Sequence, residues 1–149
     1  MNQEFIPYSL AHHPAPHRRL IGGVWLFFGL FGAPIICGLD LLADYALVGH
    51  ACYPDTEPLA SPMPGFAWTW LGVLLMHLAA LAGIVAAGLA CYRMWCVTGP
   101  KRGHMHHLME RGEGRDRFLA IVGMGFAAMF FLITAGETIA MGVVRLCAY

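Results

Sequence analysis

The chain has 149 residues, of which 58% are hydrophobic and 12% are charged, and its formal net charge is zero. A soluble domain of ordinary composition carries about 25% charged residues. A deficit of this size excludes an ordinary soluble globular domain and indicates lipid as the solvent for much of the chain. The balanced charge also gives no reason to expect nucleic acid as a partner.

Three apolar blocks are long enough to cross a membrane, since a spanning helix needs about 20 mostly apolar residues. They cover residues 20–50, 66–97 and 118–146, and we predict helices over residues 20–50, 66–97 and 117–147. The first block is too long for the apolar core of a signal peptide, about 7–15 residues, which favours a retained helix. The predicted fold is an all-α membrane protein with three transmembrane helices and a Pro-rich outer loop. A polar segment, residues 1–19, precedes this transmembrane domain, residues 20–149.

Basic residues are distributed unevenly along the chain. Eight of the nine Lys and Arg residues lie before the first apolar block or around the second connection, and the first connection, residues 51–65, has none. Cytoplasmic connections carry the excess of Lys and Arg. We therefore expect the N-terminus inside and the C-terminus outside, in a bacterial inner membrane. Four basic residues are expected to contact anionic lipid on the inner side: Arg18, Arg19, Lys101 and Arg102.

Two of the five cysteines fall just beyond the outer ends of predicted helices. Cys52 follows the first helix and Cys147 follows the third, and the compartment outside a bacterial inner membrane is oxidising. We expect a Cys52–Cys147 disulfide, with two free thiols as the alternative. Cys91 and Cys96 are five residues apart and so lie on different faces of a helix. This offset argues against a metal pair.

Three carboxylates fall within the predicted helices. Asp40 and Asp44 are four residues apart and share one helix face, and Glu137 lies in the third helix. Counted at about 1.5 Å per residue, all three lie toward the outer ends of their helices. With His50, they are expected to form an intramembrane polar cluster near Arg145. Ionisable groups inside a membrane often mark proton or ion pathways, but the shallow depth favours interfacial hydrogen bonding.

His77 is expected to lie near mid-membrane, apart from those carboxylates. A b-type haem would need a second axial ligand on a facing helix, and no other histidine lies at that depth. A hydrogen bond to a neighbouring helix or a partner is therefore the favoured role, with haem binding as the alternative. The second connection carries His104, His106 and His107, but no Cys or carboxylate stands at a zinc-ligand spacing. No metal, no cofactor and no catalytic residue is assigned.

Small residues recur at spacings that let helices approach closely. In the second predicted helix they are Ala79, Gly83 and Ala87, and in the third they are Gly136 and Ala140. Such faces can pack within this chain or against a partner, and the sequence leaves both open.

Two stretches carry a resemblance to a known family. Residues 32–54 read GAPIICGLDLLADYALVGHACYP, and residues 112–132 read GEGRDRFLAIVGMGFAAMFFL. Through the motifs HACYP and GEGR-x-RFLA, with the closing Cys147, the chain resembles a family of small three-helix proteobacterial membrane proteins found beside the genes of haem–copper cytochrome c oxidases. The family pattern has amides at the positions of Asp40 and Asp44, which implies a need for polar groups there. The match at Cys52 and Cys147 supports the disulfide.

The resemblance implies a non-catalytic accessory or assembly subunit of a respiratory membrane complex, most of all a haem–copper terminal oxidase. Such a subunit would pack against the catalytic subunits, and its outer loop could contact a periplasmic cytochrome c domain. Two alternatives come from the residues themselves. One is a b-haem or quinone-handling redox subunit that uses His77, and the other is a small proton or ion carrier that uses Asp40, Asp44 and Glu137.

Overall fold

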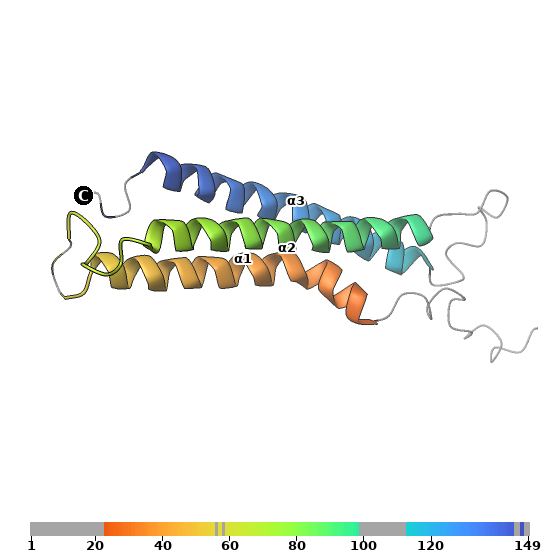
Figure 1. Cartoon of the computed structure of the whole chain (residues 1–149). Coiled ribbons are helices and arrows are strands. Elements are labelled where there is room, and N and C mark those ends of the chain that lie inside the picture. Colours follow the sequence, from red (N-terminus) through yellow and green to blue (C-terminus); the bar gives the residue numbers. More distant parts are fainter. Residues whose placement is uncertain (1–22, 56, 58, 99–112, 145–146, 148–149) are drawn as a thin grey trace, which may run out of the picture.

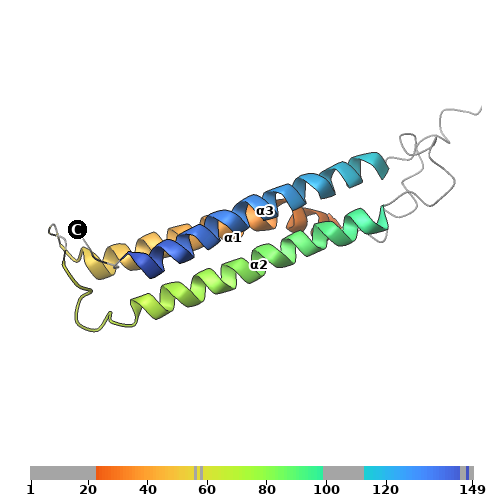
Figure 2. The same ribbon diagram turned by 90° about the horizontal axis from the view of Figure 1, so that it is seen from above.

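Three long helices make up most of the structure, a computed structural model that describes residues 23–55, 57, 59–98, 113–144 and 147. They are α1 (Gly23–Cys52), α2 (Thr69–Val97) and α3 (Glu113–Val143). The helices lie side by side along most of their length (Figures 1 and 2), and each one contacts both others. The chain is therefore an all-helical bundle.

Each helix has the length and composition to cross a membrane, which confirms the predicted three-helix fold class. At 1.5 Å per residue the helices are about 45 Å long, longer than a hydrocarbon core of about 30 Å. The bounds differ from the predicted ones most clearly in α3, which begins at Glu113 and ends at Val143. A polar first turn extends this helix beyond its apolar block, and the helix stops before Cys147.

The outer surface of the bundle is apolar and the interior is built from small residues. Leu39, Leu132 and Ile139 are 62–70% exposed, which is unfavourable in water and favourable in lipid. The buried core cluster consists of Ala33, Cys37, Ile84, Ala87 and Ala127. Small side chains let the helix backbones approach, as is usual where lipid offers no hydrophobic drive for helix association.

The buried face of α2 follows a regular spacing of three and four residues. This is the spacing at which helices pack side by side with a small left-handed crossing. Because α2 is apolar on all sides, the hydrophobicity of the sequence does not reveal this face. The buried positions in this seam are Val73, His77, Ala80, Ile84, Ala87, Cys91 and Met94.

The tightest packing of the three helices surrounds Cys91. A Cβ atom added to Gly29 of α1 would lie 2.6 Å from Cys91 Sγ, and one added to Gly123 of α3 would overlap the same sulfur and lie 3.0 Å from the Gly29 carbonyl oxygen. Both glycines are therefore required by close approach. Cys91 is fully buried whereas Cys96 is exposed, so the prediction that they lie on different faces is confirmed.

The predicted small-residue positions divide into two groups. Gly83 lies against Ile36 of α1, and Ala87 is fully buried. Ala79, Gly136 and Ala140 are instead exposed. The predicted small residues of α2 thus serve the bundle itself in part, whereas the two predicted in α3, Gly136 and Ala140, are exposed.

A disulfide joins the ends of α1 and α3. Cys52 and Cys147 are bonded, with their Cα atoms 5.6 Å apart, which confirms the predicted pairing. The following connection folds back on this end of α1, where the N–H of Leu59 donates to the carbonyl of Cys52 and the N–H of Met63 donates to that of Ala51. These bonds satisfy carbonyls that a helix end leaves without partners. We call this end of the bundle the disulfide end.

Pro34 lies inside α1. It has no N–H to donate to the carbonyl one turn earlier, at Leu30, and its ring crowds that turn. Figure 1 shows the first turns of α1 bending away from the line of the rest of the helix. The bend in α1 is therefore explained by Pro34.

Candidate functional site: a buried carboxylate–histidine cluster

Three ionisable side chains from three different helices meet inside the bundle. Asp40 of α1, His77 of α2 and Glu137 of α3 each place one ligand atom within 4.8 Å of those of the other two. His77 Nδ1 lies 3.8 Å from Asp40 Oδ2. We call these three residues the polar triad.

The triad exists because each helix turns its polar positions inward. In lipid an ionisable side chain is costly, so it faces the bundle interior. Asp40 follows Cys37 by three residues on the buried face of α1, and His77 occupies one position of the buried seam of α2. Glu137 follows the buried Thr134 by three residues on α3. Three helical periodicities therefore turn the three groups toward the bundle interior.

Asp40 is the least satisfied member of the triad. Its residue is 7% exposed, and neither carboxylate oxygen has a hydrogen-bond partner among the described residues. A buried carboxylate without hydrogen bonds carries a large desolvation cost. Native structures rarely leave such a group unpaired, and those that do call for an explanation.

His77 is held by its own helix. Its Nδ1 lies 3.1 Å from the carbonyl oxygen of Val73, one turn earlier. Because a carbonyl only accepts, Nδ1 carries the proton in this bond, and Nε2 then keeps its lone pair. The ring, 2% exposed, is thus oriented and left with one free ligand atom.

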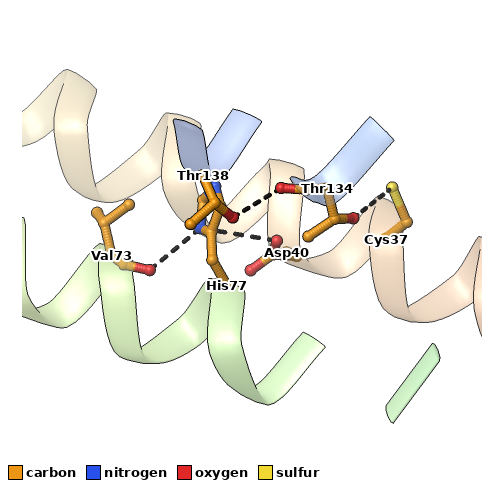
Figure 3. A network of polar contacts seen from close by, with 6 residues as sticks. All are labelled: Cys37, Asp40, Val73, His77, Thr134 and Thr138. Atoms are coloured by element: carbon orange, nitrogen blue, oxygen red, sulfur yellow. Dashed lines mark hydrogen bonds and ion pairs between the residues drawn. The ribbon is translucent and has the colours of Figure 1, made fainter. Parts of the chain in front are cut away.

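Hydroxyl groups of α3 continue the polar contacts on both sides of the triad (Figure 3). Thr138 Oγ1 donates to the carbonyl of Thr134 at 2.7 Å, and Thr134 Oγ1 donates to Cys37 Sγ at 3.6 Å. These two bonds satisfy the hydroxyl donors without using Asp40. The figure shows Asp40 directed toward His77, and no threonine hydroxyl bonds to its oxygens.

A pocket of about 350 Å³ adjoins the triad and extends toward the disulfide end. His77 and Glu137 line it, and so does Asp44, one turn beyond Asp40 on α1. One oxygen of Asp44 is also buried and has no hydrogen-bond partner in the part of the chain that the structure describes. The remaining lining residues are apolar: Val48, Val73, Ala140, Met141 and Val144.

The described basic side chains do not balance these carboxylates. Arg93 and Arg117 lie in the opposite half of the bundle. Arg93 lies about 24 Å from His77 along α2, and Arg117 lies about 30 Å from Glu137 along α3. Arg117 instead sits over the ring of Trp95, 5.5 Å from its centroid. Within the part of the chain that the structure describes, His77 is therefore the one basic group beside three carboxylates.

The structure brings together residues that the sequence alone kept apart. His77 was expected at a different depth from Asp40 and Glu137, but it lies among them. Depths counted separately along each helix miss this, because the helices exceed the bilayer thickness and are staggered. The sequence did contain a signal for this cluster. Each helix carries an ionisable residue, and in lipid all such residues must face the bundle interior.

His50 is placed elsewhere. It is exposed near the end of α1, and its ring packs edge-on against Phe66, 5.3 Å between centroids. The haem hypothesis for His77 stays a prediction. Several predicted residues lie outside the described part of the chain: Arg18, Arg19, Lys101, Arg102, His104, His106, His107 and Arg145.

Compared with known proteins, the chain matches no family model, no curated protein and no solved structure.

Proposed function

We propose that this protein is a non-catalytic accessory or assembly subunit of a respiratory membrane complex, most of all a haem–copper terminal oxidase, in a bacterial inner membrane. The resemblance of residues 32–54 and 112–132 to proteins encoded beside such oxidases supports the choice of complex. The subunit would pack its helices against the catalytic subunits, and the connection between α1 and α2 would contact a periplasmic cytochrome c domain.

The observation that carries this proposal is an unpartnered face of α3, which we call the outer α3 face. Gly125 and Gly136 lie 11 residues apart, about three helical turns, and therefore share this face. A Cβ atom added to either one would meet no atom of the described residues within 4 Å. The exposed apolar side chains on the same face are Phe118, Ile121, Met129, Leu132, Ile139 and Val143.

Among the described residues, the glycines on this face pack against no other helix of the chain. A glycine inside a helix costs roughly 1 kcal/mol relative to alanine, and Gly125 and Gly136 relieve no contact with α1 or α2. Close approach of another helix backbone would give them a function, because glycine faces are the usual contact surfaces between membrane helices. Lipid alone would be served as well by alanine or leucine.

The test is co-purification from native membranes in mild detergent. The wild-type chain should bring down the oxidase subunits, and a Gly125→Leu/Gly136→Leu variant should lose them while keeping its disulfide and its thermal stability. Gly38→Leu is the matched control, since this glycine of α1 also faces open space. Native oxidase purified with no trace of the chain would overturn the proposal.

The orientation is tested by cysteine labelling in intact cells. We propose that the disulfide end faces the periplasm and that the end of α2 with Cys96 faces the cytoplasm, in line with the Lys and Arg distribution. A membrane-impermeant maleimide should label an Asp55→Cys variant from outside, because Asp55 is exposed near the disulfide end. Cys96, which is exposed, should react only with a permeant reagent, and the reverse pattern would invert the topology.

A second candidate function, a small proton or ion carrier, is favoured by the polar triad. Ionisable groups in a bundle interior frequently lie on ion pathways, and Asp44 extends the triad into the adjoining pocket. Reconstituted vesicles decide this candidate. Changing Asp40, Asp44 and Glu137 to amides should abolish proton or cation flux, and a flux equal to that of wild type would exclude a carrier of this kind.

A further inference from the structure

We propose that the polar triad of Asp40, His77 and Glu137 binds one divalent first-row transition-metal ion, of the Zn²⁺ or Mn²⁺ class, inside the helical bundle. This site is independent of the accessory role proposed above. It uses one residue from each helix, so a bound ion would link α1, α2 and α3 at a single point.

The ligand set suits such an ion. One imidazole nitrogen and two carboxylate oxygens form a mixed nitrogen and oxygen set, as in many zinc sites that keep a fourth position for water. Ligand atoms around tetrahedral zinc are about 3.4 Å apart, given bonds of about 2.0–2.1 Å. The triad atoms lie within 4.8 Å of one another. Side-chain rotations that move each ligand atom by roughly 1 Å would therefore bring them to the spacing of a zinc site.

Charge balance favours a divalent ion over a proton at the same place. Asp40 and Glu137 together carry two negative charges when ionised, and a protonated His77 could neutralise one of them. A divalent cation neutralises both while His77 stays neutral. In a medium of low dielectric constant, an uncompensated charge costs several kcal/mol, and the described arginines lie in the opposite half of the bundle.

A further observation points to a ligand. The carboxylate of Asp40, on a side chain only 3% exposed, is directed toward His77 without a hydrogen-bond partner among the described residues. His77 Nδ1 lies 3.8 Å from Asp40 Oδ2, so the ring nitrogen that approaches this carboxylate is the one that also donates to the carbonyl of Val73. An ion bound through this nitrogen would replace the bond to that carbonyl.

The ion has a route to the site. The pocket beside the triad leads from His77 and Glu137 toward Val144 at the disulfide end. Asp44 lies in its wall with one unpaired oxygen. A carboxylate at this position would attract a cation on its way to the triad and would hold the water that completes its coordination.

The experiment uses the full chain purified with an affinity tag that contains no histidine, treated with EDTA and then dialysed against Zn²⁺. To remove competing ligands in the second connection, His104, His106 and His107 are changed to alanine in every protein tested. Elemental analysis should find about one zinc per chain. Asp40→Asn, His77→Gln and Glu137→Gln should each weaken Zn²⁺ binding by at least about 100-fold, more than the loss of an outer-shell partner does.

Matched controls come from residues outside the triad. His50→Gln and Asp55→Asn should bind Zn²⁺ like the parent protein, since both residues are exposed near the disulfide end. Replacement with Co²⁺ should give visible absorption bands that His77→Gln abolishes. Far-ultraviolet circular dichroism and the gel shift of the disulfide on reduction verify that each variant is folded. Failure of the folded parent protein to take up zinc, or uptake that persists in the triad variants, overturns the proposal.

Discussion

In the half of the bundle near the disulfide end, ionisable groups lie between the helices and a covalent bond ties the ends of two of them. In the opposite half, glycines bring three backbones together around one sulfur atom. The first half contains the polar triad, a pocket of about 350 Å³ and the Cys52–Cys147 bond. The second contains Cys91 wedged between Gly29 and Gly123.

This difference shows two ways of joining helices in lipid. Close backbone packing gives many weak contacts but leaves no space for a ligand. Ionisable groups between helices need that space. Helices that leave space for such groups lose part of the close packing between their backbones. The disulfide supplies the missing connection at the half where a site is present. The comparison predicts that each half fails through a different kind of substitution.

The largest expected effect on stability is loss of the disulfide. The bond closes a loop of 95 residues, and a loop of that length corresponds to about 4.7 kcal/mol of stabilisation in the chain-entropy description. Cys52→Ser should lower the free energy of unfolding in detergent by about that amount, measured by titration with SDS. Wild-type protein in reducing agent should behave like the variant. Cys96→Ser is the control and should match wild type, and equal stability of Cys52→Ser and wild type would contradict the prediction.

A somewhat smaller loss is expected from Gly123→Ala in the opposite half. The new methyl group would overlap Cys91 Sγ and press on the Gly29 carbonyl, and overpacking of this kind costs about 1–3 kcal/mol. Thermal unfolding in detergent measures it. Cys91→Ala in the same chain should restore part of the loss, because the overlapping sulfur is gone.

Gly125→Ala provides the comparison for that variant, since nothing lies within 4 Å of its added methyl group. We expect it to be as stable as wild type or slightly more stable, by less than about 1 kcal/mol. If Gly123→Ala and Gly125→Ala proved equally stable, close packing at Cys91 would not hold the bundle together.

A smaller change of opposite sign is expected at the triad. In metal-free protein, Asp40→Asn should raise the free energy of unfolding by about 1 kcal/mol, because the amide avoids burying an ionised group that lacks hydrogen bonds. Addition of Zn²⁺ should stabilise wild type and leave the variant unchanged. Unfolding in the presence of EDTA and then of Zn²⁺ gives both values, and a variant that is clearly less stable in EDTA would contradict the first.

The smallest effect concerns Arg117 and Trp95, which join α3 and α2 far from the disulfide. A guanidinium over an indole ring contributes about 0.5–1 kcal/mol at a partly exposed site. Arg117→Gln should therefore lower stability by no more than this. A double-mutant cycle with Trp95→Leu isolates the pair, and a coupling energy near zero would show that the contact does not stabilise the bundle.

The sequence predicts the helices and the disulfide because both follow from long-range composition. Three apolar blocks need no knowledge of packing, and Cys52 and Cys147 both follow helices that run to the same side. Which face of each helix is buried could not be predicted in this way. Gly83 is packed and Gly136 is open, although both belong to similar small-residue patterns.

The triad was not predicted as a unit for the same reason. A helix that is apolar on all sides gives no hydrophobic face to orient it, so the rotation of α2 that brings His77 toward Asp40 comes from packing around Ile84 and Cys91. Relative heights of the helices are also set by contacts and not by composition. Only the requirement that ionisable groups face inward was available from the sequence.

The connectivity of the Cys52–Cys147 bond also has a consequence for biosynthesis. Cys52 closes the first helix, but its partner follows α3, so the bond cannot form until all three helices have been synthesised. The oxidised form therefore marks chains that were synthesised at least as far as Cys147.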